Sequence, residues 1–309
     1  MTESVVVLTG GVGGAKLVLG LTQVLAPEAI TAIVNTGDDF RHLGLWVSPD
    51  IDTLLYTLSG KANAAQGWGR EGETWSFMAA LRSLGGEDWF QLGDGDLALH
   101  ALRTMRLAAG HTLSDITADF STAWGVKIAT LPMSNEPVET RLTTDEGELG
   151  FQTYFVGRRC APQVRSIAFR GAKSVGPAPG VCDAIAAATT ILIAPSNPYL
   201  SIDPILAVPG IAEALSSARA PVVAVSPIVG GDAVKGPTAK LMRELGIEVS
   251  PAAVAAHYGD LLDGFLVDQR DAEIDPGVAH ARADTLMLTL ADRVRVAEAA
   301  LRLAEQLKS

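Results

Sequence analysis

Short runs of apolar residues alternate along the chain with longer amphipathic stretches. The first run covers residues 5–8, and similar runs occur at 30–35, 190–194, 221–226 and 264–268. Each is bounded by glycine, proline or polar residues, which is typical of strands that are buried on both faces. Between them, apolar residues recur every three or four positions, as in Leu17, Leu21 and Val24, and this spacing predicts helices. The alternation predicts an α/β fold in a single domain over residues 1–309: a Rossmann-like, open and mostly parallel sheet flanked by helices.

One part of the chain breaks this alternation. Strand-like runs at 126–131 and 164–169 flank a predicted hairpin with arms at 138–143 and 150–155. Because no helix separates these runs, we expect an antiparallel addition between two parallel halves. Short helical stretches precede it from residue 67 onward. The sequence therefore predicts a small antiparallel and helical insertion over roughly residues 67–170.

The turn after the first strand carries four glycines, Gly10, Gly11, Gly13 and Gly14, followed by Lys16. Glycine lets the backbone approach a ligand closely, and the start of the next helix directs N–H groups and a partial positive charge at it. A phosphate or diphosphate suits such a place, although a tight turn that binds nothing would use the same residues. The spacing matches neither G-x-G-x-x-G nor a P-loop. A second, weaker candidate of this kind consists of Gly230, Gly231, Lys235 and Gly236.

Acidic side chains follow the second strand and open the next helix. Asn35, Asp38 and Asp39 lie where ligands bind in open α/β sheets, beyond the carboxyl end of a strand. Asp50 and Asp52 belong to Ser48-Pro49-Asp50-Ile51-Asp52, which has the residues of a helix start. Carboxylates near a phosphate-binding turn favour Mg²⁺, which takes one or two protein oxygens together with phosphates and water. A solvated turn would explain Asp38 and Asp39 as well, and helix capping alone would explain Asp50.

Composition narrows the function classes. The chain has 35 acidic and 24 basic residues, a net charge of −11, which argues against a duplex nucleic acid or an anionic membrane as partner. Its apolar runs are too short for a transmembrane helix. Cys160 and Cys182 lack C-x-x-C spacing, and no secretory signal precedes the first strand, so we expect a cytoplasmic protein with reduced thiols.

Several catalytic chemistries find no support in the sequence. There is no G-x-S-x-G or H-E-x-x-H motif, and the five histidines have no metal-ligand spacing. What remains are glycine turns, hydroxyls and acids at strand ends, which are the parts that phosphoryl transfer needs. A nucleotide-binding transferase is therefore favoured over a nicotinamide oxidoreductase, which would need G-x-G-x-x-G.

Six motifs, taken together and in order, resemble the 2-phospho-L-lactate transferase family of coenzyme F420 biosynthesis, and the similarity runs from the first strand to the final helix. The motifs are Gly10-Gly11-Val12-Gly13-Gly14-Ala15-Lys16-Leu17, Val34-Asn35-Thr36-Gly37-Asp38-Asp39, Ser48-Pro49-Asp50-Ile51-Asp52-Thr53, Leu92-Gly93-Asp94, Pro132-Met133-Ser134 and Pro195-Ser196-Asn197-Pro198 with Ser201-Ile202.

The resemblance implies a Mg²⁺-dependent phospho-group transferase. Its donor would be a guanosine diphospho-acid, GMP linked to lactyl or enolpyruvyl phosphate, and its acceptor the ribityl hydroxyl of the deazaflavin Fo. The products would be coenzyme F420-0, or its dehydro form, and GMP. The alanine-rich, lysine-poor composition hints at an actinobacterial member, for which the resemblance implies the enolpyruvyl donor. The alternative is a non-catalytic regulator of the same fold that binds a nucleotide or sugar nucleotide.

The resemblance also assigns roles to individual residues. Asp50 and Asp52 would be catalytic and hold the metal, with Asp52 contacting Fo as the candidate proton acceptor. Substrates would be bound by Gly10, Gly11, Gly13, Gly14, Lys16, Asn35, Asp38, Gln91, Met133, Ser134, Ser196 and Asn197, with Met133 and Ser134 in the deazaflavin pocket and the insertion forming part of the acceptor site. Two positions depart from the pattern: Gln91 and Gly95 stand where a basic residue is common. Asn135 stands where an acid is common, so it receives no metal role.

The last stretch, 291–307, has a heptad-like apolar stripe. Such a stripe belongs either to the core or to a subunit interface. It makes a homodimer a reasonable expectation.

Overall fold

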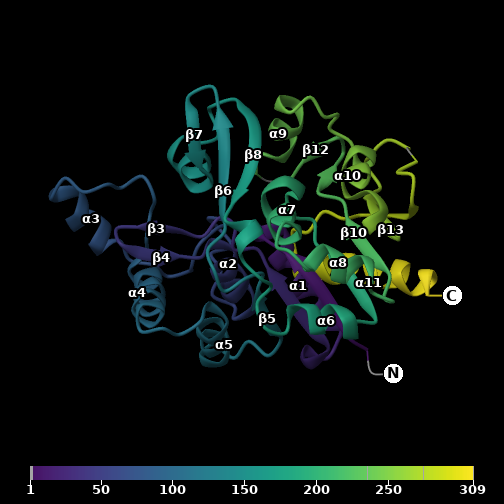
Figure 1. Ribbon diagram of the computed structural model, residues 1–309, viewed down its shortest axis with the longest axis horizontal. Helices are drawn as coiled ribbons and strands as arrows, with labels where there is room; N and C mark the ends of the chain where they lie inside the picture. Colours follow the sequence, from purple (N-terminus) through teal and green to yellow (C-terminus); the bar gives the residue numbers. More distant parts are fainter. Residues whose placement is uncertain (1–2, 235, 274, 309) are drawn as a thin grey trace.

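A seven-stranded parallel sheet forms the centre of the molecule (Figure 1). The computed structural model describes residues 3–234, 236–273 and 275–308. The strands lie in the spatial order β5, β2, β1, β9, β10, β13, β14. Numbered along the chain this order is 3-2-1-4-5-6-7, the doubly wound arrangement, and its direction of winding reverses between β1 and β9. The predicted fold class is confirmed. The strands are β1 (Val5–Thr9), β2 (Ile30–Val34), β5 (Ala129–Pro132), β9 (Thr190–Ile193), β10 (Val222–Val225), β13 (Gly264–Asp268) and β14 (Ala279–Ala283).

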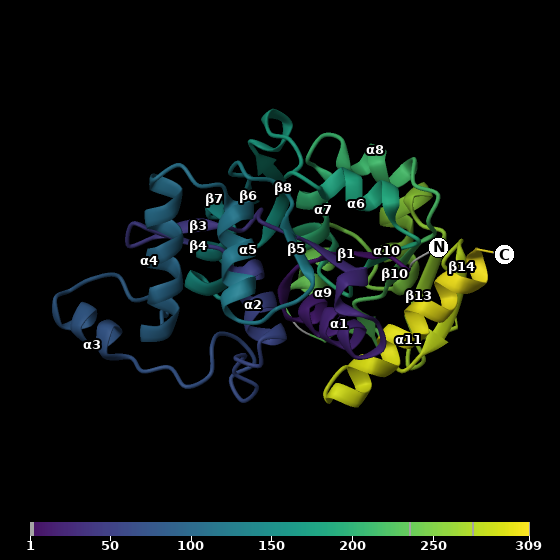
Figure 2. The ribbon, with the colours of Figure 1, turned by 90° about the horizontal axis from the view of Figure 1, so that it is seen from below.

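Alternate residues of the strands point into two separate core layers. In β1, Val5 and Val7 pack into one layer and Val6 and Leu8 into the other, which is why this strand reads as a continuous apolar run. Figure 2 shows α1 and α11 on one side of the sheet and α6 and α8 on the other. The first layer holds α1 (Gly11–Val24), α2 (Pro49–Leu58), α5 (Leu113–Ala123) and α11 (Leu290–Leu307), and the second α6 (Val181–Ala187), α7 (Asp203–Leu206), α8 (Ile211–Ser216) and α10 (Pro251–Tyr258).

The apolar stripe of α11 belongs to the core. Its buried residues include Val296, Ala300 and Leu303, which pack in the same cluster as α1 and the sheet. The two helices approach so closely that a Cβ on Gly20 of α1 would lie 2.2 Å from the carbonyl oxygen of Arg293. The stripe is therefore buried inside the protomer, and it gives no support to the expected homodimer.

Additional elements lie beyond one edge of the sheet and above it. The hairpin of β3 (Phe40–His42) and β4 (Leu45–Val47) extends outward with α3 (Ser76–Ser83) and α4 (Asp94–Ala108) (Figure 2). A three-stranded antiparallel sheet has the order β7 (Gly147–Gly150), β6 (Glu139–Thr144), β8 (Val164–Arg170), with α9 (Thr238–Glu244) close to it (Figure 1). A short hairpin, β11 (Ile228–Val229) with β12 (Asp232–Ala233), follows β10.

Two strand predictions in this region were wrong. The run at 126–131 was expected in the antiparallel addition, but it contributes β5, which pairs in parallel with β2 at the edge of the main sheet. The helix α5, directly before it, supplies the crossover that a parallel pair requires. The second arm of the predicted hairpin ends at Gly150, and residues 151–157 are helical. Helical spacing places Phe151 and Phe155 on one face, stacked at 5.3 Å between ring centroids, while Tyr154 enters a small core.

Candidate active site

The turn after β1 and the loop after β9 meet at the switch point of the sheet and line a cavity of 640 Å³. Other walls come from the start of α2, from α4, from the helical segment 151–157 and from residues 285–287. This is the crevice in which doubly wound sheets bind their ligands. The sequence predicted its location from the glycines and acids alone.

The turn between β1 and α1 is shorter than the four glycines suggest. The helix α1 begins at Gly11, so Gly10 alone separates strand from helix. The hydroxyl of Ser196 accepts the N–H of Gly10 at 3.2 Å and donates to its carbonyl oxygen at 2.7 Å. A Cβ on Gly13 would lie 2.7 Å from the carbonyl oxygen of Pro195. The glycines therefore let the N-terminus of α1 close against the β9 loop, at one wall of the cavity.

The residues predicted to bind substrate that line the cavity here are Gly10, Gly11, Gly13, Lys16, Ser196 and Asn197. The cavity lining does not include Gly14. A Cβ at Gly14 would meet the Thr9 hydroxyl oxygen at 2.1 Å, so this glycine serves the packing of helix against strand.

Asp50 is the acid that meets this turn. Its Oδ1 accepts the N–H of Gly11 at 2.8 Å, and its Oδ2 accepts Nδ2 of Asn35 at 2.9 Å. The same Asn35 nitrogen donates to Oδ1 of Asp38 at 2.9 Å, so one buried amide joins the two acids. Asp38 and Asp50 line the cavity, whereas Asn35 lies behind them and holds them in place.

Burial raises the pKa of these acids. Desolvation is the largest cause for Asp38 and Asp39, whose pKa values lie well above the ordinary range, and it raises the pKa of Asp50 to about 6. The neighbouring charge of Asp50 adds to the rise in the pKa of Asp38, and Asp52 adds to that of Asp50. Hydrogen bonds from Asn35 and Gly11 offset part of the rise for Asp50. The fold thus concentrates carboxylates where their charge is costly, which is what a bound cation relieves.

These residues fit Mg²⁺ that binds together with phosphates. Among the residues that the structure describes, no cluster of three or more histidine, cysteine or acidic side chains is arranged to hold a metal ion. Mg²⁺ needs fewer protein ligands, because phosphate oxygens and water complete its octahedron. Asp50 lies on the cavity wall next to the glycine turn. Of the two predicted ligands it fits best, because Asp52 already has a cationic partner.

Asp52 pairs with Arg103 of α4. Nη1 of Arg103 donates to Oδ2 of Asp52 at 3.2 Å, and Nη2 makes a second, short contact with Oδ1. Arg103 is only 1% exposed and Asp52 only 4%. His100, one turn earlier on α4, places Nδ1 at 3.6 Å from Oδ2 of Asp52. Burial and the adjacent Arg103 lower the pKa of His100 to about 4, so its ring is neutral near pH 7.

The sequence did not predict the place of His100 and Arg103 in this site. Their spacing of three places them on one face of a helix, but nothing in the sequence connects that face to an acid 51 residues earlier. The sequence also did not predict the place of Tyr56, whose hydroxyl makes a short hydrogen bond with Asp96 on the same wall. Burial is the first cause of the raised pKa of Asp96.

Five aromatic side chains in the cavity lining are here called the aromatic wall. They are Tyr56, Trp68, Phe90, Phe151 and Phe155. Gln91 lies beside them, with its amide nitrogen donating to the carbonyl oxygen of Asp88 at 2.6 Å and its oxygen accepting from Arg82 at 3.0 Å.

The structure does not bring Met133 and Ser134 to the cavity. Met133 is fully buried in the second core layer, and the Ser134 hydroxyl bonds with Glu136. Of the second candidate anion loop, Gly236 lines the cavity, and the N–H of Gly231 donates instead to Asp271 at 2.7 Å. Lys235 lies outside the described residues.

Another wall of the cavity includes Thr285, Leu286 and Met287, and residues that follow β10 line the cavity as well. Lys16 joins this wall to the glycine turn, because its Nζ donates to the carbonyl oxygen of Met287 at 2.7 Å.

Comparison with known proteins places this site in a family. Residues 5–305 match the family described as 2-phospho-L-lactate transferase CofD. The chain belongs to this family. Among CofD-family relatives, a phosphoenolpyruvate transferase of Kitasatospora aureofaciens is 45% identical over 316 residues, covering 98% of each chain. A 2-phospho-L-lactate transferase of Methanosarcina mazei is 40% identical over 298 residues, covering 95% of this chain and 98% of the relative.

The fold of the CofD-family chain also occurs in a solved structure, a UPF0052-family protein of Bacillus halodurans. That structure has a TM-score of 0.64 and 19% identity, and the match covers 97% of this chain and all of the other. The family predicted from the sequence motifs is confirmed, and with it a transferase of coenzyme F420 biosynthesis. None of the helices that the structure describes has the length and apolar character needed to cross a bilayer.

Proposed function

We propose that this CofD-family protein transfers the phospho-acid of a GMP-linked diphosphate to the ribityl hydroxyl of Fo. The hydroxyl oxygen forms a bond to the phosphorus that carries the acid, the bridging P–O bond to GMP breaks, and the hydroxyl proton leaves. The products are coenzyme F420-0, or its dehydro form, and GMP. The observation that carries this proposal is that the glycine turn, the buried acids and the aromatic wall face one cavity.

The donor that we favour is the enolpyruvyl one. Several relatives named phosphoenolpyruvate transferase are 43–45% identical to this chain and one, from Nocardia farcinica, is 39% identical, against 40% for the Methanosarcina mazei protein named 2-phospho-L-lactate transferase. The composition of the chain points the same way.

The donor diphosphate would bind at the start of α1. Gly10 and Gly13 line this part of the cavity, Gly11 leaves room there because a Cβ on it would meet no atom within 4 Å, and Lys16 supplies a positive charge on the same wall. Mg²⁺, held by Asp50, would neutralise charge on the transferring phosphoryl group. Asp52, the second predicted ligand, has both carboxylate oxygens engaged by Arg103 and would act in the proton transfer instead. Asp38 adds to the negative potential that attracts such an ion.

The acceptor Fo would lie against the aromatic wall. The flat rings of Trp68, Phe90 and Phe155, which belong to this wall, can stack on a deazaflavin. Asp52 would face the ribityl hydroxyl as proton acceptor. Its pairing with Arg103 fixes the direction of the carboxylate, and Nη1 of the same guanidinium donates to Nδ1 of the neutral His100 at 3.2 Å.

The decisive experiment mixes the purified protein with Mg²⁺, Fo and each donor in turn, and follows GMP release. We expect release with the enolpyruvyl donor, dependent on both Mg²⁺ and Fo. A regulator of the same fold would bind a guanine nucleotide without releasing GMP and would not quench Fo fluorescence. That outcome would replace the enzyme proposal by the alternative.

We also propose that the protein is a homodimer that uses the surface of α3 and α4. Met78 is the only buried residue of α3. Leu84, Leu102 and Met105, in or beside these two helices, are large apolar residues with 85%, 46% and 61% exposure. Light scattering during gel filtration would detect the dimer, and Met105→Lys should shift it toward monomer, whereas a wild-type monomer at high concentration would contradict the proposal.

A further inference from the structure

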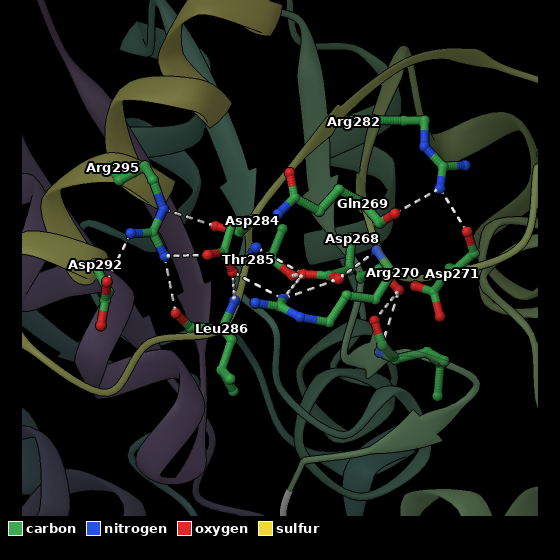
Figure 3. Close-up of polar contacts among 12 residues, drawn as sticks. Asp268, Gln269, Arg270, Asp271, Arg282, Asp284, Thr285, Leu286, Asp292 and Arg295 are labelled. Atoms are coloured by element: carbon green, nitrogen blue, oxygen red, sulfur yellow. Dashed lines mark hydrogen bonds and ion pairs between the residues drawn. The ribbon is translucent and has the colours of Figure 1, made fainter.

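A cluster of charged side chains lies behind the cavity wall that residues 285–287 form (Figure 3). At its centre is Asp268, the fully buried last residue of β13. Its Oδ2 accepts the backbone N–H of Thr285 at 2.7 Å and the Thr285 hydroxyl at 2.9 Å. Its Oδ1 accepts the backbone N–H of Arg270 at 2.8 Å, and Nη1 of Arg270 lies 3.1 Å from both oxygens.

The residues on either side of Thr285 are held by the same cluster. Nη1 of Arg270 donates to Oδ1 of Asp284 at 2.8 Å. From α11, Arg295 donates through Nε to the carbonyl oxygen of Asp284 at 3.0 Å and through Nη2 to that of Leu286 at 3.1 Å (Figure 3). Backbone carbonyls before and after Thr285 are therefore both fixed by one guanidinium.

The charged members of the cluster act at a distance from the cavity. Within the described part of the chain, the cavity lining includes Thr285, Leu286 and Met287 but neither Asp268 nor Arg270. The Thr285 hydroxyl gives its hydrogen to Asp268, so toward a ligand its oxygen can only accept. The wall thus offers an acceptor, oriented from behind, to a ligand with N–H or O–H donors.

We propose that Asp268 is a positioning residue for the nucleotide half of the donor. It fixes Thr285, and with it the wall that continues through Met287 to Lys16 and the glycine turn. Lys16 joins this wall directly to the glycine turn, where the donor diphosphate is placed, so the wall serves the donor. The inference rests on the proposed function, because that function places the donor diphosphate at the glycine turn.

Asp268→Asn and Thr285→Val test the proposal, with Thr285→Ser as the conservative rescue. Asparagine replaces one acceptor oxygen by a donor, and valine keeps the shape of threonine but loses its hydroxyl. We expect the KM for the donor, and the Kd for GDP measured by calorimetry, to rise about tenfold in both variants, since the lost hydrogen bonds involve a charged group. Thr285→Ser should restore both constants to within about twofold of wild type.

The readout that separates positioning from general damage is affinity for Fo. Its Kd, from fluorescence quenching, should stay unchanged in all three variants and in Glu298→Gln, a control on the exposed Glu298–Arg302 pair of α11. An equal rise for donor and Fo, or an unchanged donor KM, overturns the inference. If Asp268→Asn does not fold, Thr285→Val decides alone. A wild-type protein that neither binds GDP nor releases GMP would instead refute the proposed function.

Discussion

Asp50 carries a charge that the metal-free fold penalises. Its pKa is raised from 3.8 to about 6, mainly by burial. A raised carboxyl pKa contributes stability that is complete below the unfolded pKa and is lost as the pH rises through the folded pKa. Between pH 4 and about 6 this group therefore loses its stabilising contribution, and near pH 7 its ionised form weakens the metal-free protein.

We therefore expect Mg²⁺ to raise the melting temperature by several degrees at about pH 7.5 but by little at about pH 5, where Asp50 is protonated. Thermal melts with Mg²⁺ or EDTA at both pH values measure this. Asp50→Asn should reduce the gain at the higher pH. An equal gain at both pH values would show that the cation acts elsewhere.

Asp52 and Arg103 should behave as a unit. Removing one partner of a buried ion pair leaves the other charge uncompensated, so Asp52→Asn and Arg103→Met should each lower the free energy of unfolding by about 3–5 kcal/mol. The double variant should lose less than the sum of the two, as urea denaturation would show. Additive losses would mean that the pair is not coupled. Asp52→Asn should also abolish transfer, even under conditions where the variant remains folded.

At the scale of elements, substitutions of two glycines of α1 should differ in their effect on donor binding. A Cβ on Gly13 would lie 2.7 Å from the carbonyl oxygen of Pro195, beside the cavity. A Cβ on Gly20 would lie 2.2 Å from the carbonyl oxygen of Arg293, in the contact between α1 and α11. Both substitutions to alanine should cost about 1–3 kcal/mol of stability through overpacking. Only Gly13→Ala should raise the donor KM, because it moves the start of α1 away from the β9 loop. Equal KM values for the two variants would contradict this.

The sequence predicted elements well where local pattern and tertiary environment agree. The runs at β1, β2 and β9 are buried on both faces, so apolar composition alone identifies them. It failed at 150–155, where an alternating pattern gave way to helix because Tyr154 packs with Leu142 and Val164. The helical conformation of this segment depends on residues that the fold brings together, so the local sequence does not indicate it.

The cavity of the whole molecule combines an aromatic wall with a glycine turn and buried acids. Trp68 lines the aromatic wall and Trp75 lies outside the lining, although the two are similarly exposed at 48% and 37%. Trp68→Ala should raise the Kd for Fo about fivefold, in line with the loss of one aromatic contact, and leave the donor KM unchanged. Trp75→Ala serves as the matched control. A change in donor KM upon Trp68→Ala would mean that the aromatic wall contacts the donor.

The site was predictable only where its residues follow strands. Gly10, Asp38, Asp50 and Ser196 come from the carboxyl ends of neighbouring strands or the helix just beyond, and the topology of such sheets gathers them at one edge. Arg103 reaches Asp52 from a helix added outside the sheet. No rule of topology connects those two positions, so geometry alone reveals the pair.

Met78 is the one buried side chain of the helix α3. In a protomer outside the proposed dimer, few contacts hold the amides of this helix closed, so their hydrogens should exchange with solvent through small local openings, long before those of β1 or β9. Deuterium uptake followed by mass spectrometry, on dilute protein, would show this outlying helix gaining mass well before the strands of the sheet.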